Sequence, residues 1–89
     1  EFKQAQTEFD NGNYTKAIEL AEAEIEKSKK LKDSRLISEG LDISASSRIY
    51  LGKYKEAENN LNEILQNISE TETNAAYRKA LIYTRFAWL

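Results

Sequence analysis

One short stretch of this chain occurs twice, and the second copy lies 40 residues after the first. Residues 11–18 read NGNYTKAI and residues 51–58 read LGKYKEAE, so the shared positions are a glycine, a tyrosine and an alanine. The same offset superimposes further apolar residues: Ala5 on Ala45, Phe9 on Ile49, Ala21 on Leu61 and Ile25 on Leu65. A repeat that keeps glycine and apolar positions predicts a helical hairpin that stacks on its own copy. It also predicts that Tyr14 and Tyr54 lie in like surroundings.

Apolar residues recur at helical spacing through nearly the whole chain, beginning with Phe2, Ala5 and Phe9. No stretch reads as a strand. We therefore expect an all-α fold with helices at about residues 1–10, 14–31, 34–51 and 54–68. A capping box of Ser69 with Glu72 is expected to start a fifth helix. That helix carries the apolar residues Tyr77, Leu81, Phe86 and Trp88.

Glycine and polar residues mark the ends of these helices. Gly12 suits the left-handed conformation after a helix, and Asn13 is expected to cap the second helix through its side-chain oxygen. Lys53 stands at the position of Asn13 in the second copy and offers no acceptor oxygen. The start of the fourth helix is therefore predicted to be less stable by about 1 kcal/mol. Asp33 is the expected cap of the third helix. Gly40 lies inside that helix at a cost of about 1 kcal/mol relative to alanine, which indicates close approach of a neighbouring helix.

Composition narrows the possible functions. The 89 residues make one small domain, and no apolar run approaches the roughly 20 residues that span a bilayer. The formal net charge of -2 lacks the basic excess of a nucleic-acid surface. Histidine and cysteine are absent, which removes the commonest general base, the thiolate nucleophile and the usual zinc ligands. We therefore expect no enzyme, cofactor or metal site. The lack of cysteine agrees with a reducing cytoplasm, which is the expected compartment.

The two ends of the sequence indicate a piece of a longer chain. It begins Glu1-Phe2-Lys3 with no methionine anywhere, and residues 85–89 form an apolar, aromatic group. A finished repeat array normally ends in a polar capping helix. We therefore expect either that a longer chain continues the array or that two copies associate through this end.

The repeated residues resemble the tetratricopeptide-repeat family, in which helix pairs stack into a right-handed superhelix. Eight positions carry the likeness: Ala5, Gly12, Tyr14, Ala17, Ala45, Gly52, Tyr54 and Ala57. Tyr83, Phe86 and Ala87 resemble the trio that opens a further repeat. The period of 40 residues exceeds the family's usual value of about 34, the chain lacks proline, and Gln4 and Ser44 occupy the usual leucine position. Repeats of the HEAT type are the alternative within the same class.

The resemblance implies an α-solenoid of antiparallel helix pairs, with about two and a half units in five helices. The first repeat would span about residues 1–32 and the second 33–69, while 70–89 would supply the first helix of an incomplete third. All of these lie in a single domain, residues 1–89.

The same resemblance implies a non-catalytic scaffold that binds a protein or peptide in a concave groove lined by the first helix of each pair. The matching positions are Phe2, Gln6, Glu39, Asp42, Ser46, Tyr50, Thr84 and Trp88. One subset of the family clamps carboxylates with lysine and asparagine, whereas Asp42 and Ser46 stand at those places here. A ligand with basic or hydroxyl groups is therefore favoured, with an apolar side chain against Tyr50 or Trp88. Long units of this kind resemble sensor regions of bacterial regulators.

The alternative is a self-association module that forms oligomers through its exposed, apolar C-terminal helix. Tyr83, Phe86 and Trp88 would then pack against the same surface of another copy.

Overall fold

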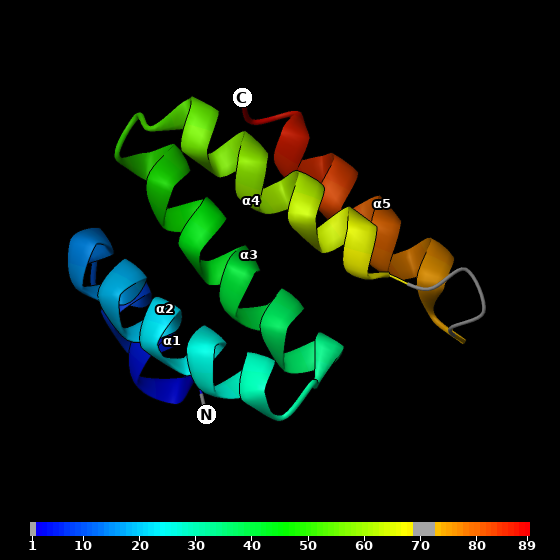
Figure 1. Cartoon of the computed structure of the whole chain (residues 1–89). Coiled ribbons are helices and arrows are strands. Elements are labelled where there is room, and N and C mark those ends of the chain that lie inside the picture. The colour runs from blue at the N-terminus through cyan, green and yellow to red at the C-terminus, as the bar shows by residue number, and fades with distance from the viewer. Residues whose placement is uncertain (1, 69–72) are drawn as a thin grey trace.

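The computed structural model describes residues 2–68 and 73–89, which form five helices and no strand (Figure 1). The helices are α1 (Lys3–Asp10), α2 (Tyr14–Lys30), α3 (Ser34–Tyr50), α4 (Tyr54–Asn67) and α5 (Ala75–Phe86). The all-α prediction is confirmed, and the first four predicted helices differ from these bounds by only one or two residues at an end. The predicted capping box of Ser69 with Glu72 lies outside the described residues.

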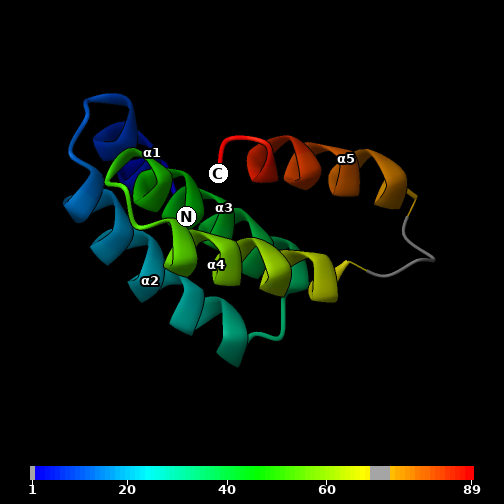
Figure 2. The same cartoon turned by 90° about the horizontal axis from the view of Figure 1, so that it is seen from above.

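Consecutive helices pack against one another, and the central helix α3 makes its largest contacts with α2 and α4. Figure 2 shows α1, α3 and α5 on one side of the molecule and α2 and α4 on the other. The packing of α5 on α4 is much less extensive than that of α3 on α4. Within the described part of the chain, no helix combines the length and the hydropathy needed to cross a membrane.

Three interhelical turns share one hydrogen-bond pattern. After α1, Gly12 has φ 83° and the amide of Asn13 donates to the carbonyl of Glu8 at 2.8 Å. After α3, Gly52 has φ 79°, and Lys53 donates to Arg48 at the same distance of 2.8 Å. This is the Schellman arrangement, so the left-handed conformation predicted for Gly12 is confirmed.

The turn after α2 has the same pattern without a glycine. Lys32 takes the left-handed position with φ 56°, and the amide of Asp33 donates to the carbonyl of Ser28 at 3.1 Å. A residue with a Cβ pays roughly 1–2 kcal/mol in this conformation, so this turn is strained where the other two are not.

The predicted cap at Asn13 is wrong, because its side chain makes no hydrogen bond to the start of α2. The Nδ2 of Asn13 instead donates to the carboxylate Oε1 of Glu8 at 2.8 Å. A hydrogen bond to a charged acceptor is stronger than one to a neutral acceptor, which accounts for the orientation. Lys53 also makes no side-chain cap, so the expected difference between the two helix starts is not present. The cap at Asp33 is confirmed, since its Oδ1 accepts from the amides of Arg35 and Leu36 at 3.1 and 3.2 Å.

Gly40 lies at a close approach of α3 to Ile25 of α2 and to Phe2. A Cβ built on Gly40 would lie 2.5 Å from Cγ1 of Ile25 and 2.6 Å from Cε1 of Phe2. Ordinary carbon contacts need about 3.5–4.0 Å, so no larger residue fits without movement of these side chains. The prediction that Gly40 permits close helix packing is confirmed.

The remaining core is built from small and branched side chains, with serine unusually common in α3. Ser38, Ser44 and Ser47 are buried, and their hydroxyl oxygens have no hydrogen-bond partner among the described residues. An unsatisfied buried polar group costs roughly 1–3 kcal/mol. The serines therefore keep α3 thin enough for close packing at a cost in stability.

The two sequence copies have the same buried alanine positions, but the surroundings of their tyrosines differ. Ala5, Ala17, Ala45 and Ala57 are each at most 1% exposed. The ring of Tyr14 stacks on that of Tyr50, with centroids 4.9 Å apart and planes 8° apart, and Phe9 meets both rings edge-on.

Tyr54 is 51% exposed and has no ring contact in the described part of the chain. The prediction that the two tyrosines share like surroundings is therefore wrong. The stacking partner of Tyr14 is Tyr50, the last residue of α3.

Candidate functional site

A hollow of about 160 Å³ lies where α1, α3 and α5 meet, and we call it the groove. Its lining is mixed polar and aromatic: Gln6, Phe9, Asp42, Ile43, Ser46, Tyr50, Arg85 and Trp88. Five of the eight predicted groove residues are in this set: Gln6, Asp42, Ser46, Tyr50 and Trp88. The structure thus brings together residues from positions 6 to 88 of the chain.

The other three predicted groove residues lie elsewhere. Phe2 is 3% exposed and belongs to the core beside Gly40, so its ring presents little surface to a partner. Thr84 is exposed, and its hydroxyl donates to the carbonyl of Ala80 at 2.9 Å in its own helix. Glu39 lines a second, neighbouring hollow.

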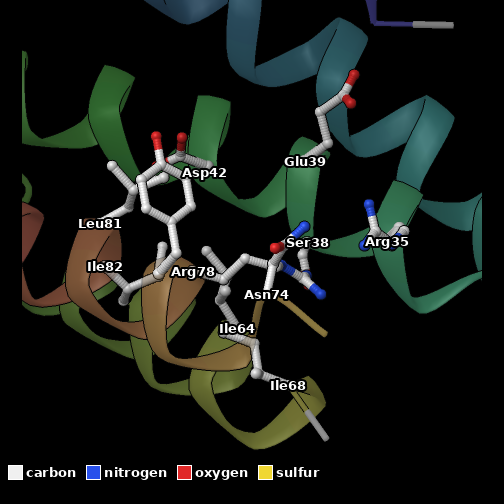
Figure 3. Close-up of a pocket in the computed structure, with 11 residues that line it drawn as sticks. Arg35, Ser38, Glu39, Asp42, Ile64, Ile68, Asn74, Arg78, Leu81 and Ile82 are labelled. Atoms are coloured by element: carbon white, nitrogen blue, oxygen red, sulfur yellow. The ribbon is translucent and has the colours of Figure 1, made fainter. Parts of the chain in front are cut away.

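This second hollow, which we call the cleft, has a volume of about 340 Å³ between α3 and α5 (Figure 3). Ile64, Ile68 and Ile82 line its apolar part and are each at most 6% exposed. Tyr77 and Leu81 line it from α5 with exposed fractions of 67% and 41%. The polar lining residues are Arg35, Ser38, Glu39, Asp42, Asn74 and Arg78.

An ion pair marks the boundary between the cleft and the groove. Arg85 Nε donates to Asp42 Oδ1 at 3.0 Å, and Arg85 Nη2 donates to Asp42 Oδ2 at 3.3 Å. Asp42 lines both hollows. The guanidinium of Arg85 also lies over the ring of Trp88, with its Cζ 4.9 Å from the ring centroid. Asp42, expected to present its charge to a ligand, is therefore already paired with a cation from α5.

Glu39 retains the acidic character expected of this face. It lies three residues before Asp42 on α3 and is exposed, and its carboxylate has no hydrogen bond or ion pair with the described residues. The guanidinium of Arg35, one turn earlier on α3, is likewise unpaired within the described ranges. The cleft thus presents a carboxylate and a guanidinium that are both accessible to a ligand.

The aromatic residues of the groove are accessible and partly held in place. Tyr50 is 60% exposed, yet its ring is stacked on Tyr14 and meets Phe9 edge-on at 5.7 Å. Trp88 is 46% exposed and is covered on one side by Arg85. Ring contacts of this kind are worth about 0.5–1.5 kcal/mol beyond burial, so the Tyr50 side chain is ordered before any ligand arrives.

Arg48 contacts polar residues of two other helices, and it lines neither hollow. Its guanidinium donates to Asn60 Oδ1 at 2.7 Å and to Glu22 Oε2 at 2.9 Å, with Glu56 Oε2 at 3.8 Å. These contacts join α2, α3 and α4. The side chain is only 14% exposed, so we interpret this cluster as a structural link between the three helices.

Helix α5 makes less extensive contact with the preceding helix than α2, α3 and α4 make with theirs. Ala75 and Ile82 are its buried residues. Tyr77, Leu81, Thr84 and Trp88 are spaced as one helical stripe, and three of them line the cleft or the groove. A second exposed stripe carries no charge and consists of Ala76, Ala80, Tyr83 and Ala87. The sequence predicts Tyr77, Leu81 and Trp88 as apolar residues of this helix and only Thr84 and Trp88 as groove positions.

Searches against family models, curated proteins and solved structures return no match for this chain. The likeness of its glycine, tyrosine and alanine positions to tetratricopeptide repeats therefore stays a prediction. The geometry of the two hollows is what bears on function.

Proposed function

We propose that this chain is a non-catalytic scaffold of tetratricopeptide type that binds a peptide segment of another protein in the groove. The observation that carries the proposal is the meeting of Tyr50 and Trp88, both accessible, with Gln6 and Ser46 in one hollow formed by three helices. Accessible aromatic side chains in a concave site, with a few polar groups beside them, are typical of recognition surfaces.

In this proposal the five helices are two and a half units of a right-handed α-solenoid. The equal turns at Gly12 and Gly52 support it, as does the placement of α1, α3 and α5 on one side (Figure 2). The first helix of each unit would then line the concave face. We further propose a cytoplasmic setting, in which the module is the interaction or sensor region of a larger regulatory protein.

The chemistry of the groove favours an extended peptide with an apolar anchor. An apolar side chain would bury itself between Tyr50 and Trp88, gaining about 25 cal/mol for each Å² removed from water. Gln6 lies beside the same hollow, although its amide nitrogen donates to Asp10 at 2.9 Å in the free protein. Its carbonyl oxygen and the hydroxyl of Ser46 are suited to hydrogen bonds with the peptide main chain.

A displayed random-peptide library panned against the protein tests this proposal. Trp88 is the only tryptophan, so its fluorescence reports binding in the groove directly. Selected peptides are expected to bind wild type and to lose about tenfold or more in affinity with Tyr50→Ala, as hot-spot residues do. Tyr54→Ala is the matched control, because Tyr54 is similarly exposed and lies outside the groove. Equal affinity of the wild type and the Tyr50 variant would refute the assignment of the groove.

A second candidate function is self-association through α5, favoured by its exposed, uncharged stripe of Ala76, Ala80, Tyr83 and Ala87. Small residues allow a second helix to approach closely, and Tyr83 is 59% exposed. Sedimentation equilibrium over a range of concentrations tests this reading. Tyr83→Glu and Trp88→Glu should each reduce the apparent mass, while Tyr54→Glu should not. A wild-type monomer whose mass neither change affects would remove this function.

A further inference from the structure

Arg85 makes two kinds of contact where it lines the groove. Its guanidinium is held by both carboxylate oxygens of Asp42 at 3.0 and 3.3 Å. It also lies over Trp88 at 4.9 Å from the ring centroid. A two-point bond to a carboxylate distinguishes arginine from lysine, and arginine makes face contacts with an indole more often than lysine does.

This arrangement is accessible to a competitor. The side chain of Asp42 is 33% exposed and that of Arg85 is 26% exposed, so neither is sealed in the core. Helix α5 packs mainly on α4 through Ala75 and Ile82, which are independent of the ion pair. Removal of the Arg85 side chain therefore leaves these buried residues of α5 in place and uncovers the Asp42 carboxylate and the Trp88 ring.

On α3 the charge nearest to Asp42 is a second carboxylate, while Arg35 and Arg78 line the adjacent cleft as well. Glu39 lies one helical turn from Asp42, lines the adjacent cleft and has no partner among the described residues. Arg35 lies seven residues before Asp42, or about 10 Å along the helix, and Arg48, six residues after Asp42, is held by Glu22 and Asn60. A guanidinium entering at Asp42 thus meets a second carboxylate before it meets a like charge on that helix.

We propose that the space between the Asp42 carboxylate and the Trp88 ring is a binding site for an arginine side chain of a partner peptide, which Arg85 fills in the free protein. The proposal rests on the groove being the peptide-binding surface and names the residue type that it reads. Exchange of one guanidinium for another leaves the charge interactions nearly unchanged. A peptide therefore displaces Arg85 only if its other side chains bind elsewhere in the groove.

The test removes the internal occupant and offers a small replacement. Arg85→Ala is titrated with ethylguanidinium at low salt, with Trp88 fluorescence as the readout and circular dichroism to verify the fold. We expect saturable binding with a dissociation constant on the order of 10 mM, as for one partly exposed charged and aromatic contact. Wild type should bind at least about tenfold more weakly, because its site is already occupied. Ethylammonium at equal ionic strength should bind more weakly than ethylguanidinium.

Two further variants define the site. Arg85→Ala combined with Asp42→Asn should lose the saturable response, while Arg35→Ala, which also removes an arginine from this face, should behave as wild type. Arg85→Gln replaces Arg85→Ala if the alanine variant loses helicity. The proposal is overturned if neither Arg85→Ala nor Arg85→Gln binds ethylguanidinium, or if both of these variants unfold. It is also overturned if adding Asp42→Asn leaves the binding intact, or if wild type binds ethylguanidinium as well as Arg85→Ala does.

The failure of this proposal is distinguishable from failure of the groove function. If the selected peptides bind wild type but show no preference for arginine, and ethylguanidinium does not bind, the groove function is supported and the arginine site is refuted. If Arg85→Ala binds ethylguanidinium but wild type binds no peptide, the arginine site is supported and the groove function is refuted. Both binding results together, with arginine enriched in the selected peptides, are the expected outcome.

Discussion

Replacing Gly40 with alanine should destabilise this protein, although alanine is the better helix former. In an open helix the change would stabilise by about 1 kcal/mol. Here the new Cβ would lie 2.5 Å from Ile25 and 2.6 Å from Phe2, more than 0.5 Å inside ordinary contact, and the two neighbours come from different helices. Overpacking of a core typically costs 1–3 kcal/mol. The net loss is therefore about 1 kcal/mol, or roughly 5 °C in melting temperature for a domain of this size.

Urea unfolding followed by circular dichroism measures this difference, with an unchanged m-value required for a simple comparison. Ile25→Ala removes the atom that the new Cβ meets, so it supplies a double-mutant cycle. The double variant should be more stable than the sum of the two single changes predicts, by about 1 kcal/mol. A stabilised Gly40→Ala protein, or strictly additive effects, would show that α2 and α3 do not approach as closely as described.

Three other substitutions test local features. Lys32→Gly should stabilise by about 0.5–1 kcal/mol, because it relieves the left-handed backbone at φ 56°, whereas Lys30→Gly, inside α2, should destabilise in the same urea assay. Ser47→Ala should stabilise by about 1 kcal/mol, because its buried hydroxyl has no partner in the described chain. Ser28→Ala, which removes a hydroxyl that donates to Glu24 at 2.9 Å, should not, and equal gains from both would refute this reason. Asp33→Ala should lower the melting temperature by about 5 °C through the loss of its cap, and Asn13→Ala, which removes no cap, should lower it less.

The features predictable from sequence are those set by neighbouring residues. Helix bounds follow from the spacing of apolar side chains, and the cap at Asp33 and the turn at Gly12 depend on two or three adjacent positions. Gly40 was also predictable, since a glycine inside a helix needs a packing reason. In each case the residue type at one position limits the backbone conformations or the packing that this position can adopt.

The features that escaped prediction depend on tertiary distance or on competition between partners. Asp42 and Arg85 are 43 residues apart, and nothing in the pattern of either helix marks them as a pair. Asn13 had two available partners, and the charged acceptor on Glu8 prevailed over the backbone amides of α2. Ile64 and Ile68 looked like ordinary core positions, although they line a cleft because α5 stands apart from α3.

The most direct test of the binding groove is a map of amide chemical shifts in the labelled protein during titration with a selected peptide. We expect the largest changes on Ser46, Tyr50 and the indole N–H of Trp88, with small changes on the outer residues of α2. Changes confined to α2 and α4, or to the stripe of Ala76 and Tyr83, would contradict the groove as the functional surface.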